Sequence, residues 1–259
     1  MNSLKTVAII PARMAADRFP GKPLAEILGM PMIGHCYHRS KLAKNVNSVY
    51  VATCDQEIAD YITQIGGRAI MTSNQHKRAT TRTAEALEHL CKENQASFDI
   101  VVMVQGDEPL ICPKVIDASL TPFKNPQIQI VNVMSETRSE EAVKDRNNVK
   151  VVVNRFQDAL YFSREPIPSL WKQENDLPRF IQTGIIAFRP RALSKFNQME
   201  ESTLEKMESI DMNRVVEEGG KIRMVATKNE TFGIDTPSEL RLAERILERD
   251  PNTKEYLNF

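Results

Sequence analysis

Short apolar runs rich in β-branched residues alternate with longer amphipathic stretches along the first half of the chain. The apolar runs predict buried strands at residues 6–10, 48–53, 68–71 and 100–104. The stretches between them predict helices at residues 31–44, 55–64 and 80–92, the first opening with proline and the second with an aspartate cap. Strands and helices that alternate in this order favour an α/β fold with a mostly parallel sheet and helices on both faces.

After about residue 125 the regular alternation of strands and long helices ends. Strand-like runs follow at residues 128–134, 149–153, 159–162 and 184–188, and the chain closes with a helix at 203–218, a strand at 221–226 and a helix at 237–248. The segment SREPIPSLWKQENDLP, residues 163–178, is rich in proline and charge, and we interpret it as an excursion from the sheet that forms a lid or a dimer arm. Because no linker is visible, we expect one domain, residues 1–259, with an insertion at about residues 135–190.

Composition excludes several classes of protein. The 259 residues contain 34 Lys plus Arg and 34 Asp plus Glu, so there is no broad basic field to hold nucleic acid. The apolar runs are far shorter than the roughly 20 residues that span a bilayer, which argues against a membrane protein. The cysteines form no CxxC pair, which fits a reducing cytoplasm without a zinc site or disulfides; they are Cys36, Cys54, Cys91 and Cys112.

The loop after the first strand, PARMAADRFPGKP, is the first candidate site. It lies beyond the carboxyl end of a strand, where open parallel sheets bind ligands, and its cations Arg13, Arg18 and Lys22 suit a triphosphate. It is not a Walker A loop, because Pro23 follows the Gly-Lys pair, and it has no GxGxxG pattern. The alternative is a surface loop with solvated cations.

Two carboxylates are candidate metal ligands. Asp107 follows the strand at 100–104 and Asp235 precedes the last helix, positions at which carboxylates can hold Mg²⁺ or simply cap the next turn. His35 and His38 have no identifiable third ligand, so we interpret them as ordinary helix residues.

Together these segments resemble the family of 3-deoxy-manno-octulosonate cytidylyltransferases, also called CMP-Kdo synthetases, over nearly the whole chain. The matching segments are IIPARMAADRFPGKPLAEILGMPMIGH, VYVATCDQEIADYITQIGGRAIMTS, VVMVQGDEPLI, NNVKVVV, ALYFSREPIP, LEKMESIDMNR and GIDTPSEL. The resemblance implies a Rossmann-like three-layer sandwich, a homodimer and the coupling of CTP to a 3-deoxy-2-ulosonic acid, with release of pyrophosphate, for surface polysaccharide or lipopolysaccharide synthesis.

The resemblance also assigns residues. Arg13, Lys22 and Asp107 would be catalytic, and Asp107 and Asp235 would hold Mg²⁺. The nucleotide would contact Pro11, Ala12, Arg13, Lys22, Met71, Thr72, Ser73 and Arg82. The sugar acid would contact Gln105, Tyr161, Arg164 and Gln182. Catalysis of such a transfer consists mostly of positioning and of cations that disperse charge on phosphate oxygens.

The chain departs from the family pattern at two places. Where the family has His-x-Ser-Gly-Thr-(Asp/Glu)-Arg, this chain has HKRATTR, so that Arg78 and Ala79 replace Ser-Gly and Thr81 replaces the acid; Gln182 stands where a histidine is usual. A lost carboxylate and imidazole would change recognition of the sugar, so an amino-substituted or otherwise modified octulosonate is an alternative substrate. A metal-dependent glycosyltransferase and a non-catalytic nucleotide-binding paralogue are further alternatives.

Overall fold

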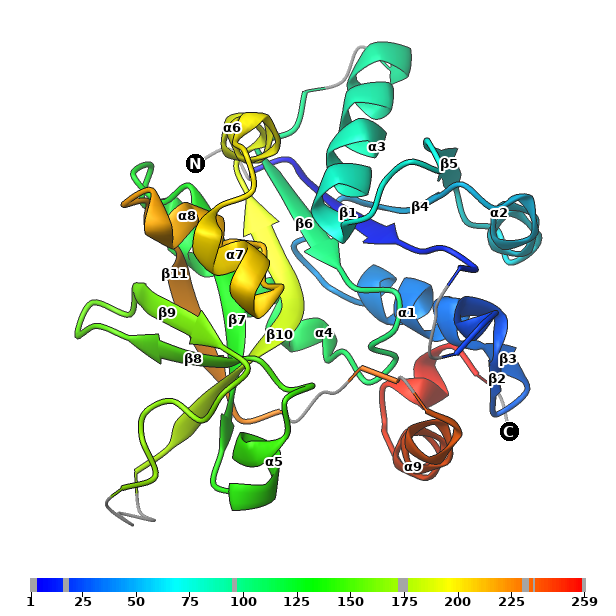
Figure 1. Cartoon of the computed structure of the whole chain (residues 1–259). Coiled ribbons are helices and arrows are strands. Elements are labelled where there is room, and N and C mark those ends of the chain that lie inside the picture. The colour runs from blue at the N-terminus through cyan, green and yellow to red at the C-terminus, as the bar shows by residue number, and fades with distance from the viewer. Residues whose placement is uncertain are drawn as a thin grey trace. The chain divides into compact units, whose positions relative to one another are not determined.

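The computed structural model describes residues 4–15, 19–94, 97–171, 177–229, 233–234 and 236–257. The chain divides into two units, which are Met1–Asp117 with Thr231–Phe259 (unit one) and Ala118–Glu230 (unit two). The helices and strands of both are labelled in Figure 1. The expected insertion at about residues 135–190 falls inside unit two, and a single domain over residues 1–259 stays a prediction.

Unit one is built on a parallel sheet. Its strands are β1 (Thr6–Pro11), β4 (Ser48–Thr53), β5 (Ala69–Met71) and β6 (Ile100–Val104). Their order is β6-β1-β4-β5, and each neighbouring pair is parallel. All residues of β1 and β6 are buried, which explains why these strands read as continuous apolar runs rather than as an alternation. The strands predicted in this part of the chain are therefore confirmed.

The helices of unit one cover both faces of this sheet. The helices that pack on its strands are α1 (Met32–Lys41), α2 (Gln56–Gln64) and α3 (Ala79–Asn94), whereas α9 (Pro237–Leu247) packs on the hairpin described below. The chain steps from β1 to β4 and β5 through α1 and α2, and then returns through α3 to β6 on the other side of β1. Right-handed crossovers in opposite directions place α3 on the face opposite α1, as Figure 1 shows. The strand order reverses between β1 and β6, and the loops that follow these two strands therefore flank the switch point of the sheet.

Several short elements lie outside this parallel sheet. They are η1 (Lys22–Leu24), β2 (Glu26–Ile27), β3 (Met30–Pro31) and η3 (Thr253–Glu255); α4 (Pro113–Leu120) follows β6. The hairpin of β2 and β3 was not predicted. It packs with α9 in an apolar cluster that includes Ile27, Ile234 and Leu247. Thr236 begins α9 with a capping box, in which its hydroxyl accepts from the Glu239 N–H and the Glu239 carboxylate accepts from the Thr236 N–H.

Unit two contains a mixed set of strands. They are β7 (Ile130–Thr137), β8 (Lys150–Val153), β9 (Ala159–Ser163), β10 (Arg179–Phe188) and β11 (Arg223–Thr227). β10 runs antiparallel to β7 and β8, and β11 runs parallel to β7. β10 begins five residues before the predicted start at residue 184. Its first half is extended because Arg179 to Gln182 pair with β7, a long-range interaction that no local pattern reports.

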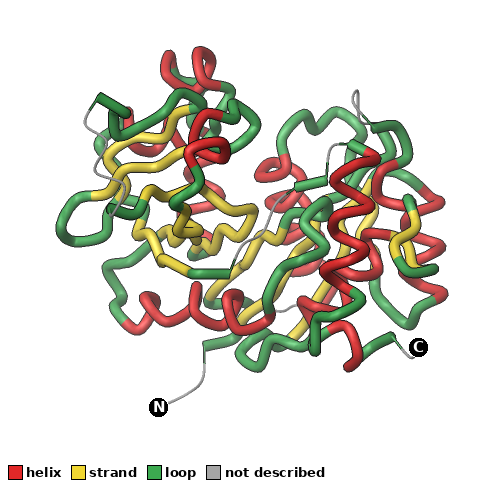
Figure 2. Tube along the Cα trace, turned by 90° about the horizontal axis from the view of Figure 1, so that it is seen from below, coloured by secondary structure: helices red, strands yellow, loops and turns green. Residues whose placement is uncertain are grey.

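The helices of unit two differ from the predicted ones at residues 203–218. They are α5 (Glu140–Lys144), α6 (Pro190–Gln198), α7 (Thr203–Glu208) and α8 (Met212–Glu217), with η2 (Thr121–Lys124) before them. The single helix expected at residues 203–218 is wrong, because Ser209 adopts a left-handed conformation with φ of 55° and ends α7. In Figure 2 the red helices lie beside the yellow strands in both units.

The proline-rich segment after β9 contains no helix or strand in its described part, residues 164–171 and 177–178, while residues 172–176 lie outside the description. Its assignment as a lid or dimer arm stays a prediction. Within the described part of the chain, every helix is too short or too polar to cross a membrane. Cys36, Cys54, Cys91 and Cys112 are free thiols in the structure.

Candidate functional site

The loops that follow β1 and β6 touch each other at the switch point of the unit-one sheet. A Cβ atom on Gly106 would lie 2.9 Å from the carbonyl oxygen of Pro11, so this approach requires glycine. The N–H of Ile234 donates to the carbonyl of Asp107 at 2.9 Å, which attaches the segment before α9 to the same place. Asp235, the next residue and a predicted metal ligand, lies outside the described residues.

A cavity of about 580 Å³ opens between these loops and the segment that precedes α3. This volume is typical of sites for small molecules. The predicted site residues that line it are Pro11, Ala12, Arg13, Lys22, Arg82, Gln105 and Asp107. The structure thus brings together residues that lie almost a hundred positions apart in the sequence. Gln105, which we expected at the sugar, lines the same cavity as the expected triphosphate residues.

Lys22 and Asp107 form an ion pair in this cavity. The left-handed Gly21, with φ of 74°, precedes η1 and turns the chain so that Lys22 is 9% exposed. The Nζ atom of Lys22 lies 2.8 Å from Oδ2 of Asp107. The Oδ1 atom of Asp107 is buried and has no hydrogen-bond partner among the described residues. Buried polar atoms are rarely left without a partner, so Oδ1 is available to a ligand or a metal ion.

Arg82, on the first turn of α3, presents a second such atom. Its Nη1 donates to Thr72 Oγ1 at 2.6 Å and to the Ser73 carbonyl at 3.3 Å, and the residue is 3% exposed. Its Nη2 is buried without a partner in the described part of the protein. Since Arg82 lines the cavity, this guanidinium has an unused donor for an anionic or carbonyl group.

The segment Met71 to Ser73, which the family resemblance assigns to the cytosine of the nucleotide, does not line the cavity. Met71 and Ser73 are exposed and Thr72 is buried, and both Thr72 and Ser73 accept hydrogen bonds from Arg82. Their assignment to the base stays a prediction.

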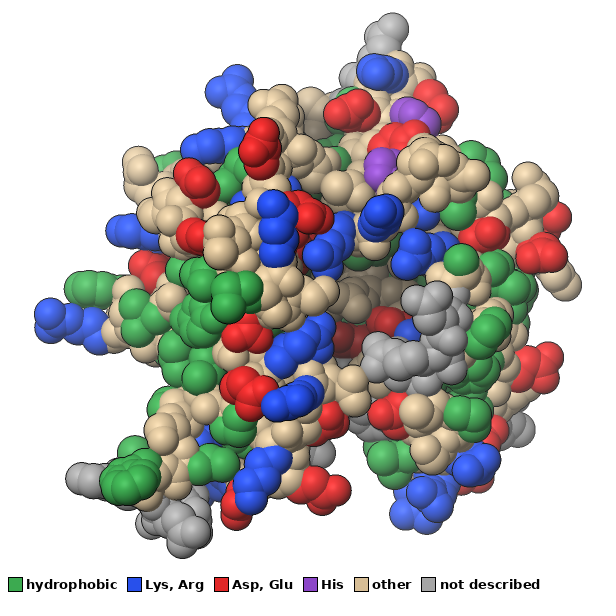
Figure 3. All heavy atoms as spheres, in the orientation of Figure 1, with side chains coloured by type: hydrophobic (Ala, Val, Ile, Leu, Met, Phe, Trp, Pro, Cys, Tyr) green, Lys and Arg blue, Asp and Glu red, His purple; other side chains and the backbone are tan. Residues whose placement is uncertain are grey.

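The segment that precedes α3 contributes residues that the sequence analysis did not place at the nucleotide. His76, Lys77, Arg78 and Ala79 line the cavity together with the loop after β1. The signal was visible in the basic HKR run, which departs from the family pattern. Thr81, which stands where the family has an acid, donates its hydroxyl to the Arg78 carbonyl at 2.9 Å. Figure 3 shows Lys and Arg side chains close to the histidines on the face where Figure 1 draws α3.

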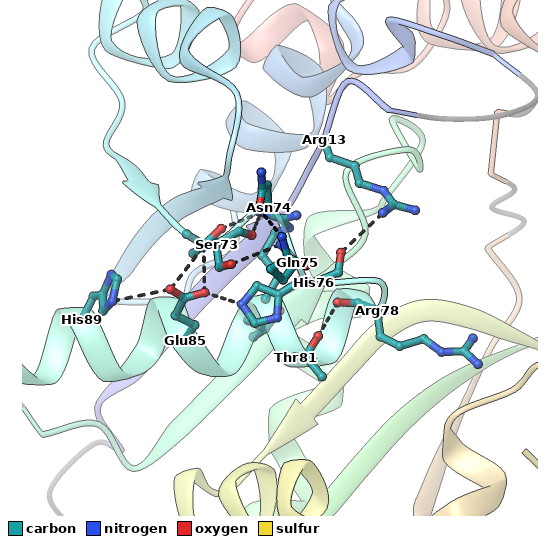
Figure 4. A network of polar contacts seen from close by, with 12 residues as sticks. Arg13, Ser73, Asn74, Gln75, His76, Arg78, Thr81, Glu85 and His89 are labelled. Carbon is teal, nitrogen blue, oxygen red and sulfur yellow. Dashed lines mark hydrogen bonds and ion pairs between the residues drawn. The ribbon is translucent and has the colours of Figure 1, made fainter. Parts of the chain in front are cut away.

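A single carboxylate organises this segment, as Figure 4 shows. Glu85 of α3 accepts hydrogen bonds from the N–H of Ser73 and from Nε2 of His76. Partial burial raises the pKa of Glu85, but the hydrogen bonds from His76 and Ser73 outweigh that effect and hold the pKa below its ordinary value. Glu85 therefore remains ionised at neutral pH.

In unit two, Tyr161 and Arg164 meet at Glu208, at the end of α7. The Tyr161 hydroxyl donates to Glu208 Oε1 at 3.0 Å, and Nε of Arg164 donates to the Glu208 carbonyl at 2.9 Å. Burial raises the pKa of Glu208, but hydrogen bonds from the Arg164 N–H, Ser163 and Tyr161 lower it below its usual value. Gln182 is separate from this cluster, because its Nε2 donates to Asn132 Oδ1 at 2.6 Å. The roles of all three residues toward a sugar stay predictions.

Among the described residues, no group of three or more His, Cys, Asp or Glu side chains is arranged to hold a metal ion. Of the two predicted metal ligands, Asp107 lies among the described residues. Its carboxylate oxygens suit Mg²⁺, which takes one or two protein ligands and completes its coordination with phosphate and water.

Comparisons with known proteins agree with this geometry. Residues 7–222 match the family model described as cytidylyltransferase. The 3-deoxy-manno-octulosonate cytidylyltransferases of Thermodesulfovibrio yellowstonii and Geobacter metallireducens are 39% and 40% identical over 93% and 95% of this chain, and over 98% of each relative. A CMP:2-keto-3-deoxy-manno-octonic acid synthetase solved in complex with CTP is 35% identical, with a TM-score of 0.85 over 95% of this chain and 99% of that chain.

A more distant likeness concerns the fold alone. A 4-diphosphocytidyl-2C-methyl-D-erythritol synthase from Anaerococcus prevotii is 13% identical, with a TM-score of 0.61 over 96% of this chain and all of that chain. The near full-length relatives and the family model lead to one conclusion: the chain belongs to the cytidylyltransferase family, in the group of the 3-deoxy-manno-octulosonate cytidylyltransferases.

Proposed function

We propose that this protein transfers CMP from CTP to 3-deoxy-manno-octulosonate (Kdo) and releases pyrophosphate. The observation that carries the proposal is the Lys22–Asp107 pair in a cation-lined cavity at the switch point of the sheet. Relatives that carry the name of this activity cover nearly the full chain, and the similar solved structure was obtained with CTP.

The residues of the cavity suit this chemistry. The anomeric hydroxyl of the sugar attacks the α-phosphorus, the bond from that phosphorus to the bridging oxygen breaks, and pyrophosphate leaves, while the hydroxyl proton passes to water. Arg13, Lys22 and Arg82 would neutralise the phosphate oxygens during this step, because fixed cations in a cavity stabilise developing charge better than water does. No nucleophilic side chain is required, since positioning and charge supply most of the catalysis.

We further propose a magnesium requirement. Oδ1 of Asp107, buried and without a partner among the described residues, would be one ligand, and Asp235 would be the second, as the family resemblance implies. Bound Mg²⁺ would supply further charge neutralisation at the phosphates. Lys22 shares the carboxylate of Asp107 and so orients it toward this position.

We propose a homodimer because unit two carries an exposed aromatic side chain. Trp171, in the segment expected to form a dimer arm, is 90% exposed, and an exposed large aromatic side chain is typical of an interaction surface. Light scattering after size-exclusion chromatography tests it, and a monomer at micromolar concentration would refute it. A cytoplasmic location and a role in surface polysaccharide synthesis stay predictions.

A modified octulosonate is the second candidate acceptor. Arg78 and Ala79 line the cavity at positions where the family has Ser-Gly, so the wall of this site differs chemically from that of its relatives. A carboxylate and an imidazole that usually contact sugar hydroxyls are absent, and polar sites discriminate strongly against unmatched hydroxyl partners.

A pyrophosphate-release assay tests both proposals. Purified protein is given CTP and Mg²⁺ with a panel of ulosonic acids that includes Kdo and 8-substituted Kdo analogues, while ATP, GTP and UTP serve as nucleotide controls. We expect release with CTP and one of these acids. No release with any acid would refute the transferase, and release of a nucleoside mono- or diphosphate from a nucleotide sugar, without pyrophosphate, would support a glycosyltransferase.

The choice between acceptors is made by a matched variant. The combined substitution Arg78→Ser, Ala79→Gly, Thr81→Asp and Gln182→His restores the family pattern, and kcat/KM is compared for Kdo and its analogues. A shift of preference toward Kdo in the variant supports the modified acid, whereas preference for Kdo in both proteins supports Kdo itself.

A further inference from the structure

Two side chains of α3 hold the loop formed by residues 72–78: Arg82, which lines the cavity, and Glu85, which does not. Arg82 binds oxygen acceptors of the loop, at Thr72 and at the Ser73 carbonyl. Glu85, about one turn further along the helix, binds donors of the loop instead. The loop is therefore held by complementary charges from one helix face.

Glu85 contacts this loop at two positions, Ser73 and His76. Its oxygens accept the N–H of Ser73 at 3.0 and 3.2 Å, near the start of the loop, and Nε2 of His76, near its end. Because an ionised carboxylate only accepts, Nε2 of His76 must carry the proton of this bond. His89 lies one turn further along α3, with its Nε2 3.8 Å from Glu85 Oε1. Figure 4 shows Glu85 between these groups.

Through its contacts with the loop, Glu85 also fixes the position of groups that line the cavity. The carbonyl oxygen of His76, whose ring Glu85 holds, accepts a hydrogen bond from Nη1 of Arg13 at 3.4 Å. The next residues, Lys77 and Arg78, line the cavity directly. In Figure 4 Arg13 and Arg78 lie on the side of the loop away from Glu85. The carboxylate of Glu85 thus supports cations of two loops, which are Arg13 after β1 and Lys77 and Arg78 before α3.

Repulsion between the cations that line the cavity explains why the 72–78 loop needs to be held in place. The described lining of the cavity includes Arg13, Lys22, Lys77, Arg78 and Arg82, whereas Asp107 is the carboxylate among the described lining residues. Like charges gathered in one cavity repel one another when no anion is bound, and this repulsion favours a loop that swings into solvent. A fixed anion and its hydrogen bonds oppose that displacement, so that the cations are in place before the triphosphate arrives.

We propose that Glu85 is a positioning residue for CTP, which holds the 72–78 loop and, through the His76 carbonyl, Arg13 in the geometry that receives the triphosphate. This inference rests on the proposed function. Glu85 does not line the cavity, so its effect reaches the nucleotide only through the loop.

The test compares Glu85→Ala and Glu85→Gln with Glu88→Ala, which removes an exposed carboxylate from the same helix. Binding of CTP is measured by titration calorimetry without any sugar acid, and KM is measured separately for CTP and for the acid. We expect Glu85→Ala to weaken CTP binding at least tenfold and to leave KM for the acid within twofold. Glu85→Gln, which retains one oxygen acceptor but no charge, should fall between this variant and wild type, and Glu88→Ala should match wild type.

A double variant checks the route of the effect. If Glu85 acts through the loop, His76→Ala should weaken CTP binding, and Glu85→Ala with His76→Ala should lose much less than the two single losses combined. CTP binding within twofold of wild type in Glu85→Ala and Glu85→Gln would overturn the proposal, and so would equal losses for CTP and the acid. Failure of wild type itself to bind CTP would refute the proposed function instead. If Glu85→Ala does not fold, Glu85→Gln and His76→Ala decide alone.

Discussion

The ammonium group of Lys22 lies 2.8 Å from Oδ2 of Asp107, although 85 positions separate the two residues in the sequence. The pair forms because β1 and β6 are parallel neighbours, so that the loops after them leave the sheet at the same edge. The side chain of Lys22 is 11% exposed and that of Asp107 is 30% exposed, so Lys22 is the more buried member of the pair.

Removing the charge of Asp107 should affect catalysis far more than folding. We expect Asp107→Asn to lower kcat at least about a hundredfold, because it removes a charge that would hold the metal ion and orient Lys22. The variant should still fold, since the side chain is not part of the apolar core. Asp60→Asn on α2 is the control, and near-normal turnover in folded Asp107→Asn would return this residue to a capping role. Asp235→Asn should behave like Asp107→Asn.

Lys22→Ala and Arg13→Ala should impair the handling of CTP rather than of the sugar acid. Both cations line the cavity at the loop after β1, where they would face phosphate oxygens. We expect KM for CTP to rise or kcat to fall, with KM for the acid nearly unchanged, as steady-state kinetics with each substrate varied can measure. A change confined to KM for the acid would place this loop at the other substrate.

The pair of Glu205 and Arg214 should be the main ionic support of α7 and α8. Nε and Nη2 of Arg214 donate to the two carboxylate oxygens of Glu205 at 2.6 and 2.7 Å, and both side chains are almost fully buried. Breaking such a pair leaves one uncompensated buried charge, so Glu205→Gln or Arg214→Met should cost about 3–5 kcal/mol of unfolding free energy. Urea denaturation measures the loss, and a double variant with Glu205→Leu and Arg214→Met should lose less than either single change.

His35 should make the protein less stable in mild acid. Its Nε2 donates to the Ile27 carbonyl and its Nδ1 accepts from the Tyr256 hydroxyl, both at 2.8 Å, which fixes a neutral ring. Burial lowers the pKa of His35 to about 4 from 6.5. Below pH 6.5 the unfolded chain takes up a proton that the folded chain refuses until the pH approaches about 4, so the folded state loses stability across this window.

The loss of unfolding free energy that His35 causes between pH 6.5 and about 4 is up to about 3 kcal/mol. His35→Gln, which can donate to Ile27 and accept from Tyr256 without titrating, is the matched variant. The difference in urea-unfolding free energy between wild type and His35→Gln should grow to the disadvantage of wild type from pH 7 to pH 4. A difference that does not change with pH would contradict the buried neutral ring.

Local pattern was enough to predict the parallel sheet of unit one. β1 and β6 are buried on both faces, so each is a continuous apolar run, and the amphipathic stretches between the strands are long enough to identify α1, α2 and α3. The pattern failed where the structure depends on partners distant in sequence or on one backbone conformation. The start of β10 is extended through pairing with β7, and the left-handed Ser209 divides a stretch that reads as one helix.

Strand periodicity and motif residues are local properties, and they were enough to predict the fold of unit one, the family, and Arg13, Lys22, Arg82 and Asp107 as residues of one site; Lys77 and Arg78 were not predicted there. Only the tertiary structure joined Lys22 to Asp107, left Nη2 of Arg82 and Oδ1 of Asp107 without partners among the described residues, and placed Glu85 behind the loop of His76. These relationships depend on which loops meet at the edge of the sheet. That meeting is fixed by the packing of whole strands and helices, and no spacing along the chain records it.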